Sequence, residues 1–322
     1  MEFNDSRTFG VEIEFNTPNY ADTLHQVSLV VPVIERNASR NGFSETDWVF
    51  KDDASLGPMG KELVSPPLRG KEAFDTIQEV CNTLVGTGGN IDSRCGLHVH
   101  HGVRDMNAKQ AVNAVHAYDW MYGLIEPVLA ESRKDSRWAL KVRPNERQLY
   151  KRMRGEQNQN TEWIRKYLSN GRYRTVNLSP GGQGFLRGRW DGIVKSTIEF
   201  RQHQGTLNPK KIEMWVRMTQ LIIEMSKREV LDFTDQPAIN DAYYFKWVVT
   251  KVLAMGSKNF GDIIKYVEDR QAQLEQGRVL RELNSQEDAH SVPMPPTRRR
   301  RGSSINAQAD RMYRVVNTRW TG

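Results

Sequence analysis

The chain has 322 residues, a formal net charge of +7 and 38% hydrophobic residues, which suffices for a packed core and excludes global disorder. Its longest apolar run covers six positions, Leu29 to Ile34, whereas a membrane-spanning helix needs about 20, so no membrane partner is expected. A secretory signal pattern is absent from the first residues, and two cysteines are too few for a disulfide scaffold, so we expect a cytoplasmic protein.

The first quarter of the chain predicts two helices and three strands. Residues 8–15 alternate apolar and polar side chains, as a half-buried strand does, and a helical pattern follows over 21–40. Two short strands, 48–55 and 61–66, bracket the Gly- and Pro-containing turn LGPMG. An amphipathic helix over 71–85 ends at the glycines of GTGG.

The middle of the chain repeats the strand-then-helix order. Residues 95–103 (CGLHVHHGV) alternate again, and 107–130 show a long, mostly apolar helical pattern. The stretch 134–170 is polar and charged, which predicts an insertion or lid rather than core.

Strand patterns return at 172–180 and 196–205, and helical patterns follow at 207–228, 241–255 and 261–283. Strands and helices come in pairs without a strict βαβ rhythm. This order favours an α+β fold with a mainly antiparallel sheet.

The positive charge lies at the end of the chain. Residues 291–322 carry seven Arg and one Asp, a net of +6, which leaves +1 for residues 1–290. We expect a single, nearly neutral domain over 1–290 and a basic, flexible tail over 291–322. A solvated tail and a tail that contacts nucleic acid or an acidic partner are equal alternatives.

Three predicted strands combine an apolar face with a face that carries two charged or ligating side chains, because strand side chains alternate with period two. These pairs are Glu12 and Glu14, His98 and His100, and Glu199 and Arg201. Each pair alone is more common as a solvated face, a structural histidine or an ion pair. If the strands share a sheet, the pairs converge into a set of oxygen and imidazole ligands that suits Mg²⁺ or Mn²⁺.

Five motifs follow one another in an order that resembles the amidoligase family, which is related to glutamate-cysteine ligases and glutamine synthetases. They are FGVEIEF, DASLGPMGKELVSPPL, CGLHVHHG, RTVNLSP and TIEFRQHQGT, and the resemblance spans residues 7–230. It implies a curved, mainly antiparallel sheet flanked by helices that cradles ATP and two or three Mg²⁺ ions. The family is mostly bacterial and phage, which implies the cytoplasm, or the host cytoplasm for a phage protein.

The resemblance also implies a role for individual residues. The metal ligands would be Glu12, Glu14, Glu62, His98 and Glu199. Arg201 would contact the transferred phosphate, and Asp53 would line the nucleotide or substrate. Independently of the resemblance, the reaction needs a carboxylate near the attack site to accept the amine proton, and Asp53 is our candidate for it. The nucleotide or substrate would be lined by Ser55, His100, Arg174 and Asn177. Many glutamine synthetases have Arg where this chain has Thr197, so either the phosphate is held by fewer cations or a residue of the polar stretch 134–170 takes the place of that Arg.

The expected function is an ATP- and Mg²⁺-dependent ligase that joins a carboxylate to an amine through an acyl phosphate. A metal-dependent hydrolase or nuclease would use the same ligands without ATP. A non-catalytic nucleic-acid-binding or virion protein would depend on the tail instead.

Overall fold

A computed structural model describes residues 3–36, 43–154, 165, 167–168, 173–191, 195–228 and 260–289. The chain divides by its internal contacts into two units, Met1–Glu275 and Gln276–Gly322, and every described strand belongs to the first. The predicted helix over 241–255 and the basic tail over 291–322 lie outside the described residues.

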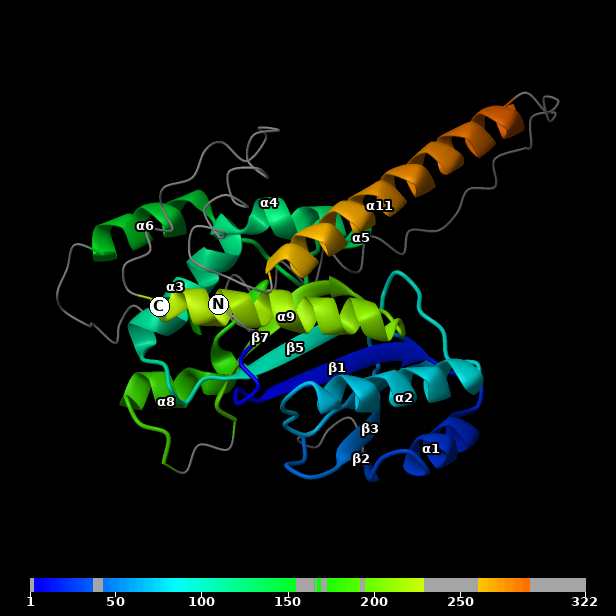
Figure 1. Ribbon diagram of the computed structural model, residues 1–322, viewed down its shortest axis with the longest axis horizontal. Coiled ribbons are helices and arrows are strands. Elements are labelled where there is room, and N and C mark those ends of the chain that lie inside the picture. The colour runs from blue at the N-terminus through cyan, green and yellow to red at the C-terminus, as the bar shows by residue number, and fades with distance from the viewer. Residues whose placement is uncertain are drawn as a thin grey trace, which may run out of the picture. The chain divides into compact units, whose positions relative to one another are not determined.

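Seven strands form one sheet in the order β2-β3-β4-β1-β5-β7-β6 (Figure 1). Their bounds are β1 Phe9–Asn16, β2 Val33–Arg36, β3 Trp48–Asp52, β4 Gly60–Val64, β5 Gly96–Gly102, β6 Val176–Asn177 and β7 Thr197–Gln204. Only the edge pair β2 and β3 is parallel among the described strands. The predicted α+β class with a mainly antiparallel sheet is therefore confirmed.

The strand register aligns the polar pairs of the sequence. Glu14 faces Glu62 across β1 and β4, and Glu12 faces His98 across β1 and β5. On β7, Glu199 lies opposite both His100 of β5 and Asn177 of β6. Directly opposed residues share a face of the sheet, so these side chains are neighbours on one side of it.

The pairing of β5 and β7 contains an irregularity beside the polar face. Leu97 pairs with His203, but Val99 pairs with Phe200, so two residues of β7 oppose His98 alone. Such a bulge shifts the alternation of the strand and re-aims its side chains. As a result His203 turns into the core against Trp215, whereas Arg201 stays on the polar side with Glu199.

The described helices differ in length. The longer ones are α1 Tyr20–Ser28, α2 Glu72–Gly86, α3 Ala108–Trp120, α6 Pro144–Arg154, α9 Pro209–Ser226 and α11 Phe260–Ala289. The short ones are α4 Tyr122–Ile125, η1 Glu126–Val128, α5 Glu131–Lys134, η3 Ser179–Gly181 and α8 Gly182–Arg187. Figure 1 shows α2 and α9 lying along the strands.

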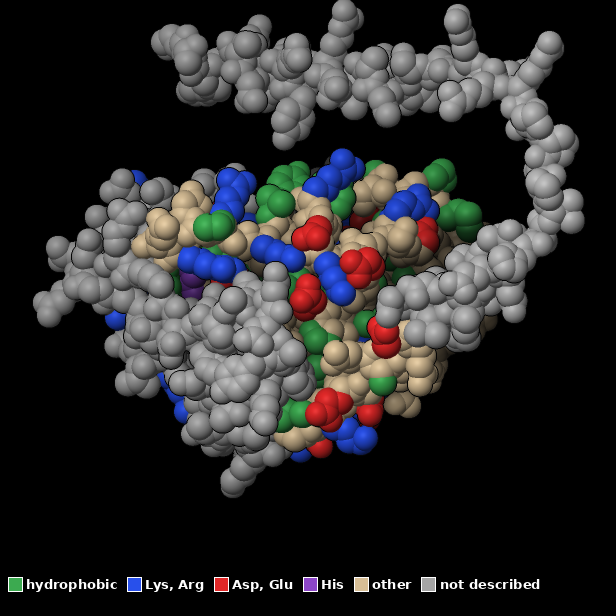
Figure 2. All heavy atoms as spheres, turned by 90° about the horizontal axis from the view of Figure 1, so that it is seen from above, with side chains coloured by type: hydrophobic (Ala, Val, Ile, Leu, Met, Phe, Trp, Pro, Cys, Tyr) green, Lys and Arg blue, Asp and Glu red, His purple; other side chains and the backbone are tan. Residues whose placement is uncertain are grey.

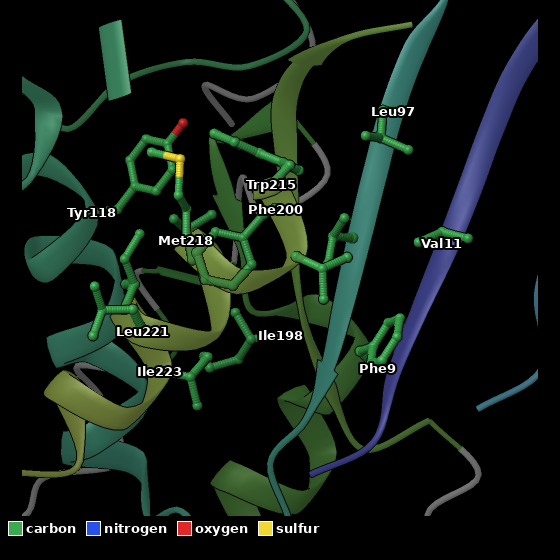
Figure 3. Packing of buried hydrophobic residues seen from close by; sticks show 14 of the residues in the cluster. Phe9, Val11, Leu97, Tyr118, Ile198, Phe200, Trp215, Met218, Leu221 and Ile223 are labelled. Atoms are coloured by element: carbon green, nitrogen blue, oxygen red, sulfur yellow. The ribbon is translucent and has the colours of Figure 1, made fainter. Parts of the chain in front are cut away.

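The apolar face of β7 packs on α9. Figure 3 shows Ile198 and Phe200 directed at side chains of α9, with Tyr118 of α3 beside them. The rings of Tyr118 and Phe200 lie 6.0 Å apart, and both side chains are fully buried. Burying large apolar groups between sheet and helices is the main stabilising contribution to such a layer. The sheet is thereby fixed on one side, and its other side is left for polar groups.

Two predicted helices are shorter in the structure. The helix expected over 21–40 ends at Ser28, and Val33–Arg36 form the parallel strand β2. Pro32 has no N–H to continue the helix, and the β-branched residues around it favour a strand. The helix expected over 107–130 breaks at Met121, and Pro127 lies in a short 3-10 turn.

Part of the stretch 134–170 lies in the core, although its polarity predicts an insertion or lid. Val142, Tyr150 and Tyr167 are buried and belong to the hydrophobic core, so the prediction that this stretch lies outside the core is wrong for these residues. The strand expected over 172–180 is reduced to Val176–Asn177, because Pro180 follows within one turn of 3-10 helix.

Charges of both signs are mixed on the visible surface. Figure 2 shows Lys and Arg side chains interspersed with Asp and Glu rather than gathered into a basic face. This agrees with the small net charge of residues 1–290. Within the described helices, none is both long and apolar enough to cross a membrane.

Candidate active site

Four adjacent strands bring the five predicted metal ligands together on the polar face of the sheet. These are Glu62 of β4, Glu12 and Glu14 of β1, His98 of β5 and Glu199 of β7. They form two groups of potential donors, Glu12 with His98 and Glu199, and Glu14 with Glu62 and His98. In each group the donor atoms lie within 4.8 Å of one another. Carboxylate oxygens and an imidazole at this spacing fit a hard divalent cation.

His98 joins the two groups through opposite sides of its ring. Its Nδ1 lies 3.0 Å from Glu12 Oε2 and 3.6 Å from Glu199 Oε1, and its Nε2 lies 3.6 Å from Glu14 Oε1. The backbone N–H of Gly96 donates to Glu14 Oε2 at 2.6 Å. The ligands are therefore held by the strands and by one another.

The pKa values of Glu12 and Glu62 are shifted in opposite directions. Burial alone would raise the pKa of Glu12, but His100 and His98 outweigh it and hold that pKa well below its usual range. Burial raises the pKa of Glu62 well above its usual range, the charge of Glu12 adds to this, and Lys51 opposes it. Carboxylates at close range repel one another, which costs free energy in the folded protein. A bound divalent cation would reduce this repulsion.

Cations and an amide surround the carboxylates. Arg201 forms an ion pair with Glu199, and Lys51 forms one with Glu62, directly opposite it across β3 and β4. Asn177 Nδ2 donates to Glu199 Oε2 at 2.6 Å. Glu199 is thus oriented from two sides.

His100 lies at the β7 edge of the first group. Its Nε2 lies 3.1 Å from Glu12 Oε1, and its Nδ1 lies 3.1 Å from the hydroxyl of Thr197. Burial would lower the pKa of His100, but the charges of Glu12 and Glu199 raise it. A histidine held in this way can present an N–H to an anionic group.

A cavity of about 520 Å³ opens beside Glu12 and His100. Its lining includes four cations, namely Arg7, which pairs with Asp105 and Glu224, and Arg69, Arg104 and Lys195. The cavity lies at the N-terminal end of β1, since its lining includes residues between Asn4 and Glu12 but not Glu14.

The opposite end of the cluster carries a buried arginine. A Cβ built on Gly96 would lie 3.0 Å from Arg133 Nη2 and 3.2 Å from both Glu14 Oε2 and His98 Nε2. Burial lowers the pKa of Arg133, the charge of Glu14 opposes this only in part, and Arg201 adds to the lowering. Only a glycine leaves room for these three groups to converge at this position.

Three other predicted site residues lie elsewhere. Asp53 and Ser55 are in the turn between β3 and β4, where Asp53 Oδ1 accepts a hydrogen bond from the Ser55 N–H at 2.8 Å. The charge of Asp53 helps to raise the pKa of Lys51, which pairs with Glu62. Arg174 is buried in an ion pair with Glu146 and lies over the ring of Tyr167. Neither of these two contacts of Arg174 involves the carboxylates around His98.

Lys51 and Arg133 were not predicted from the sequence. Lys51 could have been predicted from the turn LGPMG, because the hairpin around this turn pairs Lys51 with Glu62. Arg133 lies in the four-residue helix α5, far in sequence from every motif, and has no local signal.

Comparison with known proteins identifies the family. The sequence model of the family described as "putative amidoligase enzyme" matches residues 5–223, more than half of the chain. No curated protein matches the chain significantly. The matched range includes every strand that carries the cluster. The chain therefore belongs to the amidoligase family, as its five sequence motifs predict.

Proposed function

We propose that the protein is an ATP- and Mg²⁺-dependent carboxylate-amine ligase that forms an amide bond through an acyl phosphate. The observation that carries this proposal is the pair of donor groups sharing His98, with Arg201 beside them. Membership of the amidoligase family supports amide-bond formation as the reaction. The proposal includes a fold relationship to glutamine synthetases and glutamate-cysteine ligases, with which the mostly antiparallel sheet is compatible.

A carboxylate does not react with an amine at neutral pH, so it must first be activated. Transfer of the γ-phosphoryl group of ATP to a carboxylate oxygen gives an acyl phosphate and ADP. The amine then attacks the acyl carbon, and phosphate leaves with the C–O bond electrons. Bound Mg²⁺ would supply charge neutralisation of the phosphates.

The residues of this chain would orient and neutralise the reacting groups. Arg201 is fixed by Glu199, and its guanidinium is suited to the charge that spreads over a phosphoryl group during transfer. His100 would donate to a phosphate oxygen from its position beside Glu12. Asp53 remains our candidate for accepting the amine proton.

The cavity beside Glu12 supports nucleotide binding at that end of the site. Arg69, Arg104 and Lys195 give its lining the cations that a polyphosphate requires. Lys195 also lies 5.8 Å from the ring of Phe43, which offers an aromatic face to a base. We infer that the phosphates point from this cavity toward Glu12 and His98.

The first experiment is a thermal unfolding series with no ligand, Mg²⁺, ATP, and ATP with Mg²⁺. A ligand that binds only the native state raises its apparent stability, so ATP with Mg²⁺ should raise the Tm by several degrees. Glu199→Gln should lose this rise. The matched control is Glu213→Gln, a glutamate of α9 that pairs with Lys210 and Arg217.

The second experiment traps the acyl phosphate. Hydroxylamine attacks such intermediates, so a carboxylate substrate should give a hydroxamate and one ADP for each turnover, only with ATP and Mg²⁺ present. Absence of any ATP effect, together with metal-dependent cleavage of nucleic acid, would establish the hydrolase instead. Nucleic-acid retention without either activity would favour the non-catalytic alternative.

A further inference from the structure

A second cavity, of about 480 Å³, lies between the beginning of α9 and the first half of α11. All of its lining residues precede residue 276 and therefore belong to the first of the two units. None of them lines the cavity beside Glu12 or belongs to the two groups of potential metal donors. A ligand in this second cavity would therefore be bound apart from the candidate active site.

The lining of the second cavity carries more positive than negative charge, with four cations and two anions. Lys265 pairs with Asp269, and Lys210 pairs with Glu213, which lies one turn further along α9. The second anion, Asp262, is exposed and forms no ion pair with a described residue. Two cations of the lining are left over.

These two cations are Lys211 of α9 and Arg270 of α11. Within the described part of the chain, neither of them pairs with a carboxylate. Arg270 Nη1 donates to the amide oxygen of Gln273 at 3.3 Å, but its buried Nε has no partner among the described residues. Most of the guanidinium and the whole ammonium group are therefore left to bind something else.

The positive charge at this place is not compensated by the described residues. Burial lowers the pKa of Lys211, the charge of Arg270 lowers it further, and no described carboxylate opposes the two. Burial lowers the pKa of the neighbouring His203 to about 3, although its hydrogen bond with the Gln204 carbonyl opposes this. The charges of Lys211 and Arg270 add to that lowering. An anion in the cavity would reduce the repulsion between the two cations.

A hydroxyl group and an apolar side chain complete the lining. The hydroxyl of Tyr266 is buried and has no hydrogen-bond partner among the described residues, which costs free energy unless a ligand supplies one. Burial raises the pKa of Tyr266 to about 12, against the charge of Arg270, so the hydroxyl keeps its proton and can donate it. Met214 and the ring of Tyr266 offer apolar surface to the remainder of a ligand.

The charge and the volume together indicate the chemical class of the ligand. Two unpaired cations suit an anion with two charges, and a phosphate monoester carries between one and two near pH 7. Guanidinium and ammonium groups are also the common partners of phosphate oxygens. A phosphate ion is only a few times larger than a water molecule, whose share of liquid volume is about 30 Å³, so it would fill a small part of the cavity.

We propose that this second cavity binds a small phosphorylated molecule, with its phosphate group on Lys211 and Arg270 and its organic part against Tyr266 and Met214. The inference goes beyond the proposed ligase function and does not depend on it, because the two cavities share no residue. Free phosphate would bind the same cations without using the apolar surface.

The test is calorimetric binding of three probes to the full chain at pH 8: inorganic phosphate, phenyl phosphate and methyl phenyl phosphate. Phenyl phosphate combines two charges with a ring, its methyl ester keeps the ring with one charge, and inorganic phosphate lacks the ring. Phenyl phosphate should bind about tenfold more tightly than either, since a charge-assisted hydrogen bond or a buried ring contributes about that factor. The double variant Lys211→Gln with Arg270→Gln should lose this preference.

The control variants separate the second cavity from the first. Phosphates can also enter the cavity beside Glu12, so the matched control is Arg69→Gln with Lys195→Gln, which removes two cations there. This control should still prefer phenyl phosphate. A preference that is lost in the control and kept without Lys211 and Arg270 would overturn the proposal and assign the probe to the first cavity.

Folding is checked by the Tm. Lys211→Gln removes a partly buried charge that Arg270 repels, so the Tm without ligand should stay equal or rise, whereas a structural role of Lys211 would lower it. Phenyl phosphate should raise the Tm of the wild type and leave that of the Lys211→Gln, Arg270→Gln variant unchanged.

Absence of phenyl phosphate binding to the wild type, or equal binding of phenyl phosphate and its methyl ester, would overturn the proposal. Equally tight binding of inorganic phosphate, lost in the Lys211→Gln, Arg270→Gln variant, would overturn the organic ligand in favour of free phosphate. In every case the response of the Tm to ATP with Mg²⁺ tests the ligase proposal separately, and that response should be the same in this variant as in the wild type.

Discussion

Gly96 is the residue at which the packing of the site is tightest. A methyl group there would meet Arg133, Glu14 and His98 at 3.0–3.2 Å, closer than ordinary van der Waals contact. Gly96→Ala should push these side chains apart and weaken Mn²⁺ binding at least tenfold. The dissociation constant, from calorimetry or the EPR signal of free Mn²⁺, measures the effect.

Gly86→Ala is the control for this glycine, since a Cβ at the end of α2 meets nothing within 4 Å. It should leave Mn²⁺ affinity unchanged. Equal affinities for both variants and the wild type would mean that the ligands do not depend on the space above Gly96.

Asn177 allows a second test at the residue scale, because its amide donates to Glu199 inside the site. Asn177→Asp keeps the shape but replaces the donor with a carboxylate. Two adjacent carboxylates raise the pKa of their pair, so folding should cost about 1–3 kcal/mol more at pH 8. This cost is present above the raised folded pKa and disappears as the pH falls toward the unfolded values near 4.

The measurement for Asn177→Asp is the free energy of unfolding from pH 8 to pH 4, with and without Mn²⁺. The deficit should shrink at low pH and also on adding Mn²⁺, which would bind the added charge. A deficit that neither acid nor metal reduces would contradict the electrostatic explanation and indicate a packing defect.

At the scale of elements, α3 is joined to the stretch that follows α5 by a buried histidine. His116 Nε2 lies 2.7 Å from the hydroxyl of Tyr167, and its ring stacks on Tyr150 at 3.9 Å. Burial lowers the pKa of His116 to about 3, and the charges of Arg147 and Arg174 add to the lowering. The neutral ring is therefore required for the folded packing.

This lowered pKa predicts how stability depends on pH. The unfolded histidine takes up its proton near pH 6.5, whereas the folded one resists protonation down to about pH 3. The contribution of His116 is complete above pH 6.5 and decreases by about 1.4 kcal/mol per pH unit below it. His116→Phe should flatten the slope of unfolding free energy between pH 6.5 and 4, and an unchanged slope would contradict the assignment.

Features that depend on consecutive residues could be predicted from the sequence, whereas features that depend on tertiary packing could not. Alternation along β1 is a property of consecutive residues, so it predicted that Glu12 and Glu14 share a face. The helix predicted over 21–40 is present but ends at Ser28, because Pro32 and the β-branched residues around it favour the strand that follows. The position of Arg133 could not be predicted from the sequence, because tertiary packing, including its hydrogen bond with Gln202, places it beside Gly96.

At the scale of the whole molecule, charge is divided unequally between residues 1–290 and residues 291–322. Residues 291–322 carry a net of +6 out of +7, and both signs are mixed on the visible surface of the described part (Figure 2). Any affinity of the chain for DNA should therefore depend on residues 291–322. Binding through seven arginines would fall steeply with salt, by nearly one power of salt concentration for each phosphate contact.

The comparison is between the full chain and a chain ending at residue 290, with DNA retention measured from about 50 to 200 mM salt. Truncation should remove the salt-dependent retention and leave the Tm rise with ATP and Mg²⁺ unchanged, because the site lies between β4 and β7. The control for chain length is the full chain with the four substitutions Arg298→Gln, Arg299→Gln, Arg300→Gln and Arg301→Gln. Because these remove four of the seven arginines, the dependence of DNA retention on salt concentration should fall by more than half. Retention that survives truncation would place the DNA-binding surface within residues 1–290, and it would make the nuclease alternative the stronger one.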